Sequence, residues 1–431
     1  MGDVTTRKRR SRTGCSQCRT VSRKCDEVHP RCGRCQRLRY DCAYRSALTW
    51  KDETPKYTRD PEPNDVWTSR HAQSDAGLES SSGPPSDADE STLIRHFKAS
   101  GHHALHWSTD FTEQFFDVVG RSIDTCAALK EAILAFELLV LDAPKVTALS
   151  RVSTTLDLFQ EMLNSQHEYG TELMWTTGFL VCHIAMQAGH QWTPQLESLL
   201  AMLTKPMVAQ GEHHLVPDDN LDRLAGLDMD AWYVGKTTPS LHIWSTFCVG
   251  RTGIEPTANL PRSLMDLMAR VPHDRSVESE LQQWRAPRYK TIPDAQPSVW
   301  HIFRQAAILR LYEDQHDAIS LPLVVAARND IMELLQARWE SVNRSGSHKS
   351  NRMLVWPLFV AGIFTVNEAE QRFIAQVLSQ LCPLRKSFPR TNPCLILQEF
   401  WRRKAEESLC GAATVTPNLI ALEWGVEIGV W

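Results

Sequence analysis

Six cysteines between residues 15 and 42 follow a spacing that strongly limits how this part of the chain can fold. The pattern is C-x2-C-x6-C-x6-C-x2-C-x6-C, and its members are Cys15, Cys18, Cys25, Cys32, Cys35 and Cys42. A C-x2-C pair lets two thiolates from one tight turn bind the same metal ion, and zinc takes four ligands in a tetrahedron. Six thiolates are too many for one such site and too few for two separate ones. They suffice for two zinc ions that share two bridging thiolates, and the repeated half-pattern at residues 15–25 and 32–42 fits that arrangement.

The alternative for a cysteine-rich segment is a disulfide framework, which is typical of secreted proteins. The N-terminal sequence MGDVTTRKRRSRTG contains no apolar stretch that could act as a signal peptide. We therefore expect reduced cysteines and structural zinc, with every position around each ion filled by a thiolate and none open for catalysis. The remaining cysteines, from Cys126 to Cys410, are scattered singly and are expected to be small buried residues.

The N-terminal segment is also strongly basic. Residues 1–50 contain 13 Lys or Arg against 4 Asp or Glu, in a chain whose total net charge is −4. A basic end on an otherwise acidic protein favours binding to the phosphates of nucleic acid. The basic run also predicts a nuclear import signal, and hence a nuclear protein, at Arg7, Lys8, Arg9 and Arg10.

Residues 12–45 resemble the binuclear zinc cluster (two zincs, six cysteines) of fungal transcription factors. The Thr-Gly before the first cysteine, the Cys-Asp-Glu at the third cysteine and the linking Pro30 all match that family. The resemblance implies that the first and fourth cysteines, Cys15 and Cys32, bridge both zinc ions and that the other four are terminal ligands. It also implies double-stranded DNA as the partner.

In that family, the residues between the second and third cysteines read a C-G-G triplet in the major groove. Two adjacent basic residues usually stand where this chain has Val21 and Ser22. The commonest specific base contact is between Lys or Arg and guanine. Val21 cannot make this contact, and Ser22 offers only one short hydroxyl. We therefore expect DNA binding with a weakened or altered triplet preference. The predicted DNA-contacting residues are Arg19, Ser22, Arg23, Lys24, Arg34 and Arg37.

The rest of the chain divides by composition. We predict a basic tail at 1–13, the cluster at 14–45, a disordered linker at 46–92 and a helical regulatory domain at 93–431. The linker is rich in Pro, Ser, Asp and Glu and has too few apolar residues to form a core. It contains no leucine heptad, so the protein either binds DNA as a monomer or forms a homodimer through the helical domain. No apolar run reaches the roughly 18 residues that span a bilayer, so we expect a soluble protein without a membrane partner.

Helical periodicity dominates from about Leu93, which predicts a mainly α fold: the small cluster plus a large all-helical domain. Apolar stripes predict helices over 127–141 and 148–163. Thr193-Pro194 and Asn392-Pro393 each place a capping side chain before a helix-starting proline. Further helices are expected at Val299 to Tyr312, Arg328 to Val342 and Glu368 to Leu381, whereas 205–240 and 271–296 are poorly marked.

A second resemblance lies in the segment Trp356 to Gly362, WPLFVAG. It is similar to the WPLF-x-AG stretch of the fungal-specific transcription factor regulatory domain, second subtype, which implies contacts with the transcription machinery or coactivators. The chain has no phosphate-binding, nucleophile-elbow or dinucleotide motif, so we do not expect an enzyme.

Three further patterns have a simple structural interpretation. His102 and His106 could share a helix face as metal ligands, but the glutamate of a metalloprotease motif is absent, and a surface or core position is favoured. The tryptophans are expected in the core, with a ligand pocket as the alternative. The alternating residues 422–430 predict a strand that closes the helical domain, or else a short acidic and hydrophobic activation segment.

Together these observations predict a sequence-specific DNA-binding transcription factor acting with RNA polymerase II, on a secondary-metabolism or a stress and nutrient gene set. The alternative is a transcriptional cofactor or corepressor whose degenerate zinc cluster acts through protein contacts. Val21 and Ser22 keep this alternative open.

Overall fold

The structure is a computed structural model of the whole chain, and it falls into two compact units, Met1–Ser80 and Ser81–Trp431. It describes residues 17–18, 25–26, 31–38, 89–105, 112–165, 169–210, 218–255, 258–271, 273–289, 296–315, 318–345, 353–410 and 415–429. The first unit contains one described helix, α2 (Gly33–Leu38).

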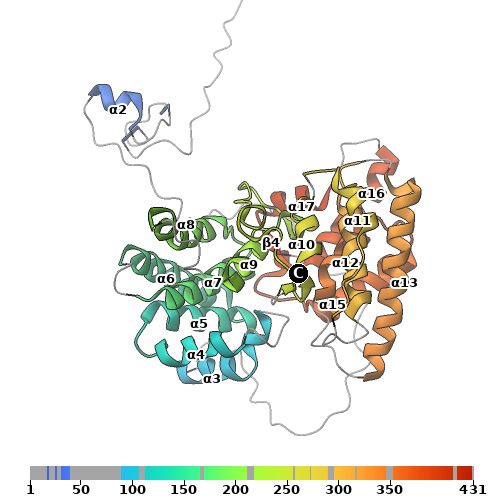
Figure 1. Cartoon of the computed structure of the whole chain (residues 1–431). Coiled ribbons are helices and arrows are strands. Elements are labelled where there is room, and N and C mark those ends of the chain that lie inside the picture. Colours follow the sequence, from blue (N-terminus) through green and yellow to red (C-terminus); the bar gives the residue numbers. More distant parts are fainter. Residues whose placement is uncertain are drawn as a thin grey trace, which may run out of the picture. The chain divides into compact units, whose positions relative to one another are not determined.

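The second unit is built almost entirely of helices, as predicted (Figure 1). Its first helices are α3 (Glu90–Ala99), α4 (Thr112–Ser122), α5 (Ala127–Val140), α6 (Lys145–Asn164), α7 (Thr171–Gln187), α8 (Thr193–Gln210) and α9 (Asp218–Gly226). The next are α10 (Arg262–Met268), α11 (Val277–Gln283), α12 (Gln296–Arg310), α13 (Pro322–Ser345), α14 (Val355–Ile363), α15 (Glu368–Leu381), α16 (Pro393–Cys410) and α17 (Pro417–Trp424). Four two-residue strands complete it: β1 (Tyr233–Val234), β2 (Ile254–Glu255), β3 (Leu260–Pro261) and β4 (Ile428–Gly429).

Helices α3 to α8 form one group, with α5 and α7 at its centre (Figure 1). The sequence of α5, AALKEAILAFELLV, is apolar on nearly every side, so the helix must be covered all round. Helices α3, α6 and α7 pack against it and provide that cover. Helix α7 is buried in the same way from Met174 to Met186.

Helices α11 to α16 form a second group around α12 and α14. Helix α14 contains the WPLFVAG segment and is buried from Val355 to Gly362, between α12, α13, α15 and α16. The indole of Trp356 is fully buried, and its Nε1 donates a hydrogen bond to the carbonyl oxygen of Ala231 at 2.7 Å. This bond anchors α14 to the segment that leads into β1.

The two groups share one hydrophobic core, and the C-terminal segment helps to join them. Strand β4 pairs antiparallel with β1, with Ile428 opposite Val234 and Gly429 opposite Tyr233. Gly235 has a φ of +80°, and a side chain there would collide with the carbonyl oxygen of Val426. The close pairing of β1 with the C-terminus therefore requires glycine at this position.

Most of the predicted helices are confirmed. Helix α15 has the predicted bounds, and α12 and α13 contain almost all of the segments predicted for them. Asn392 caps α16 as predicted, since its Oδ1 accepts a hydrogen bond from the backbone N–H of Cys394 at 2.9 Å. Most of the described tryptophans are also core residues as expected, including the fully buried Trp192 and Trp300.

Two details differ from the predictions. The capping role of Thr193 is wrong, because α8 already includes Thr193 and its buried hydroxyl has no hydrogen-bond partner. The predicted strand at 422–430 is shorter than expected, because α17 continues to Trp424 and only Ile428–Gly429 pairs as β4. The segment does close the helical fold, which was the favoured interpretation.

Helix α3 begins at Glu90, inside the stretch predicted as linker. Its first turn is held by ion pairs, because Glu90 contacts Lys130 at 2.7 Å and Arg151 at 3.2 Å. These partners lie on α5 and α6, so the helix start depends on contacts that are distant in the sequence.

Candidate zinc and nucleic-acid site

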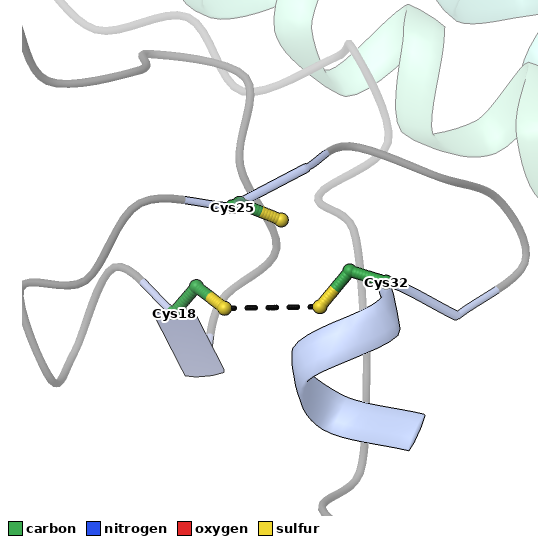
Figure 2. A group of neighbouring side chains, drawn as sticks. All are labelled: Cys18, Cys25 and Cys32. Carbon is green, nitrogen blue, oxygen red and sulfur yellow. Dashed lines mark hydrogen bonds between the residues drawn. The ribbon is translucent and has the colours of Figure 1, made fainter. Parts of the chain in front are cut away.

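Three of the six patterned cysteines meet in the N-terminal unit. The sulfur atoms of Cys18, Cys25 and Cys32 all lie within 4.8 Å of one another, and the three side chains point toward a common centre (Figure 2). All three residues are buried, with exposed fractions of 0%, 4% and 0%. Cys18 and Cys32 are 14 residues apart in the sequence, so their proximity is a tertiary contact.

The geometry of this group fits a tetrahedral metal site. The Sγ atoms of Cys18 and Cys32 are 3.7 Å apart. Four thiolates at about 2.3 Å from a zinc ion would be separated from one another by about 3.8 Å. The same distance is far longer than a disulfide bond, which measures about 2.05 Å. The three thiols are therefore arranged as metal ligands rather than as a disulfide.

Helix α2 positions Cys32 and Cys35 at its start. The backbone N–H of Gln36 donates to the carbonyl oxygen of Cys32 at 2.9 Å, which forms the first helical turn. The N–H of Cys35 points at the Cys32 sulfur at 3.4 Å. A backbone N–H directed at a thiolate stabilises its negative charge and fixes the orientation of the ligand.

Asp26 joins the Cys25 segment to the start of α2. Its two carboxylate oxygens accept hydrogen bonds from the N–H of Gly33, at 3.2 Å and 2.9 Å. A methyl group at Gly33 would lie only 2.7 Å from Asp26 Oδ2, so a larger residue there would have to displace the Asp26 carboxylate. The sequence interpretation did not assign a role to Asp26 or Gly33, although their places beside the third cysteine and inside the second C-x2-C pair could have indicated one.

The other predicted site residues are only partly described. Cys35 is buried on α2 but does not belong to the group of three, which suits a terminal ligand of the second ion. The remaining predicted positions lie outside the described residues; they are Cys15, Cys42, Arg19, Ser22, Arg23, Lys24, Arg7, Lys8, Arg9 and Arg10.

Arg34 and Arg37 lie on α2, but their exposure differs. Arg37 is exposed in the last turn of the helix, where it can reach a phosphate. Arg34 is half-buried, and its Nη1 is buried and has no hydrogen-bond partner in the residues that the structure describes. Of these two predicted contacts, Arg37 is the more exposed.

The helical unit does not add a metal centre among its described residues. His102 is buried, its Nδ1 lies 2.9 Å from the carbonyl oxygen of Phe97, and it packs against Phe116. This is the core position that was favoured over metal binding, and His106 lies outside the described residues. Within the described part of the chain, no helix is both long and apolar enough to cross a membrane.

Comparison with known proteins agrees with this geometry. Residues 13–51 match the fungal Zn(2)-Cys(6) binuclear cluster domain. The chain carries this cluster domain. Domains of this family bind two zinc ions and DNA. The three assembled thiols, with Cys35 beside them, have the donor chemistry that such a cluster needs.

The helical unit has a match of its own. Residues 271–412 match the fungal specific transcription factor domain. This region includes the WPLFVAG segment of α14.

A curated relative covers a short segment only. The chain is 39% identical over 62 residues to the uncharacterized transcriptional regulatory protein C965.10 of Schizosaccharomyces pombe. The aligned segment covers 14% of this chain and 12% of that protein. No solved structure matches the chain.

Proposed function

We propose that this chain is a nuclear transcription factor that binds double-stranded DNA through its N-terminal zinc cluster. The observation that carries the proposal is the buried group of Cys18, Cys25 and Cys32, whose sulfur spacing suits zinc. When bound, zinc supplies cross-links that fold the loop between these cysteines, and a module of this size has little other core. The protein's own residues then present the basic side chains to DNA.

Six cysteines act as the ligands in this proposal. Cys32 bridges both ions together with Cys15, and Cys18 and Cys25 complete the first site. Cys35 and Cys42 complete the second. The position of Cys32 in the described group, with Cys35 one helical turn away, supports its role at the junction of the two sites.

The basic residues divide into those that position the module and those that read bases. Arg37 is exposed on α2 and contacts a phosphate, as does Arg34 through the part of its side chain that reaches the surface. Such contacts give affinity without sequence preference. Base reading falls to the segment from Arg19 to Lys24, where Val21 and Ser22 replace the two basic residues typical of the family. The triplet preference is therefore weaker than in relatives that have both.

The helical domain supplies regulation in this proposal. Residues 93–431 act as one regulatory domain, because the helices before residue 271 share a single hydrophobic core with the family-matched segment 271–412. This domain contacts coactivators or the RNA polymerase II machinery, provides any homodimer interface and has no enzymatic role. The run from Arg7 to Arg10 directs nuclear import, and the linker 46–92 connects the two parts.

The test uses the full-length zinc-loaded chain and two duplexes, one with a CGG triplet and one with a scrambled site. Fluorescence anisotropy over a series of salt concentrations measures affinity and its salt dependence. Sequence reading predicts a preferred duplex at every salt concentration, because base contacts are less sensitive to salt than phosphate contacts are. The double variant Val21→Arg/Ser22→Lys should bind the CGG duplex at least about tenfold more tightly, since each good base contact contributes roughly 1–3 kcal/mol.

A second candidate function is a transcriptional cofactor or corepressor that acts through protein contacts, and Val21 and Ser22 favour it. Two results together would support it: a steep salt dependence without preference between the duplexes, and no gain in the double variant. An unbiased selection from random duplexes, performed with the full chain, would then recover no enriched site. Enrichment of any site would instead exclude this candidate.

A further inference from the structure

A cavity of about 200 Å³ lies inside the helical unit, where segments far apart in the sequence meet. Its apolar wall includes Leu105, Val140, Met186, Leu381, Phe388 and Ile428. These residues come from the first helix group, from the second helix group and from strand β4. A ligand in this cavity would therefore contact both groups and the strand that closes the fold.

Among the described residues that line the cavity, Arg385 carries the positive charge. Arg385 donates two hydrogen bonds from Nη2, to the carbonyl oxygen of Gln187 at 2.6 Å and to Oγ1 of Thr391 at 2.7 Å. Its Nη1 is buried and has no hydrogen-bond partner among the described residues. Burial lowers the pKa of Arg385 to about 10, so the guanidinium remains charged at neutral pH.

The charge of Arg385 lacks a counterion within the described part of the chain. Asp142 is the carboxylate that acts on it electrostatically, but no ion pair joins the two. The Asp142 oxygens instead accept hydrogen bonds from the backbone N–H groups of Lys386 and Ser387, at 2.7 Å and 2.9 Å. Arg385 is half-buried, so its charge is partly removed from water, and a bound anion would offset the cost of that burial.

The loop that carries Arg385 is well held in place. Besides the Asp142 bonds, the hydroxyl of Ser387 donates to the carbonyl oxygen of Ala143 at 2.7 Å. Asn392 closes the far end of the loop, because its Nδ2 donates to the carbonyl oxygen of Cys382 at 2.8 Å. The guanidinium therefore has a fixed orientation before any ligand binds, which lowers the entropic cost of binding.

We propose that this cavity binds a small organic anion, whose carboxylate pairs with Arg385 and whose apolar body packs against the wall formed by Leu105, Val140 and Met186. Both N–H groups of Nη2 are already used, so Nη1 is the group that would donate a charge-assisted hydrogen bond to the carboxylate. The volume is below the roughly 300–1,000 Å³ of sites for drug-sized ligands, so the ligand is small. If the ligand regulates transcription, that role rests on the proposed function. The binding of the anion to the cavity does not, because it does not involve DNA.

The experiment measures the thermal unfolding of the full-length chain with hexanoate, benzoate and phenylacetate. The uncharged analogues hexanamide, benzamide and phenylacetamide have the same shape, and inorganic phosphate provides an anion without an apolar body. At least one carboxylate should raise the melting temperature, while its amide and phosphate should not. Arg385→Met should weaken the binding of that carboxylate at least tenfold, measured by calorimetry.

Two further variants keep the test decisive if Arg385→Met unfolds the protein. Val140→Phe keeps the charge but fills the cavity, and it should also abolish binding. Arg390→Met removes an exposed arginine from the same loop without touching the cavity, and it should bind as the wild type does. The proposal is wrong if none of the carboxylates shifts the melting temperature, or if the amides or phosphate bind equally well. It is also wrong if Arg385→Met or Val140→Phe binds the carboxylate as tightly as the wild type does.

Discussion

Glu427 is a buried carboxyl group whose replacement should change how the stability of the protein depends on pH. The residue precedes β4 and is 2% exposed, and within the described part of the chain neither of its carboxyl oxygens has a hydrogen-bond partner. Burial raises its pKa to about 8 from an ordinary value of 4.5. The ammonium of Lys236 opposes this rise, but it is already paired with Asp230 at 2.8 Å and Asp228 at 3.5 Å.

The direction of the effect follows from which state binds the proton. Between pH 4.5 and about 8, the folded state keeps the proton of Glu427 while the unfolded state has lost it. The contribution of Glu427 to the free energy of unfolding is therefore fully present below pH 4.5. It is lost as the pH rises from there through the folded-state pKa. One pKa unit corresponds to about 1.4 kcal/mol, so the loss between pH 5.5 and pH 8 should reach about 3 kcal/mol.

Glu427→Gln removes the titrating group while keeping its shape. Urea unfolding of the wild-type chain and of the variant, at several pH values from 5.5 to 8, gives the two free energies of unfolding. The variant should gain about 3 kcal/mol relative to the wild type over this range. Glu423→Gln on α17 changes an exposed glutamate and serves as the reference for the loss of a carboxylate. Parallel curves for wild type and Glu427→Gln would refute the reasoning.

Two other substitutions test the site and the core. Gly33→Ala should push Asp26 away from the start of α2 and weaken zinc affinity by about tenfold, as is typical when a residue that supports a metal ligand is lost. Competition with a coloured zinc chelator measures the affinity, and Arg37→Ala on the same helix serves as the control. Trp356→Phe should lower the free energy of unfolding by about 2 kcal/mol, because the carbonyl of Ala231 loses its buried donor; an unchanged urea midpoint would show that this hydrogen bond does not contribute.

The helical periodicity of the sequence was sufficient to predict much of the fold. The bounds of α15 could be predicted because its apolar residues recur at helical spacing and Leu381 ends the pattern. The pairing of β1 with β4 could not, because each strand has two residues and its partner lies almost two hundred residues away. The start of α8 was also missed by one residue, since the Thr-Pro pattern does not reveal which residue begins the helix.

Part of the candidate site could likewise be predicted from the sequence, and part could not. The spacing of the cysteines indicated the metal and its stoichiometry, because a metal site constrains ligand spacing directly. The support from Asp26 to Gly33 depends on how two segments approach each other, which spacing does not encode. The cavity around Arg385 likewise combines residues that are far apart in the sequence. They extend from the 3₁₀ helix η1 (Gly101–Ala104) to β4, so the cavity can be recognised only in the folded structure.

The most direct test of the central claim measures zinc content and DNA affinity on the same preparation of the full-length chain. We expect two zinc ions per chain and a measurable affinity for duplex DNA. Removal of zinc by a chelator should abolish that affinity, and returning zinc should restore it, because metal-binding energy is folding energy in such a module. A chain that binds DNA equally well without zinc, or that holds no zinc at all, would contradict the account.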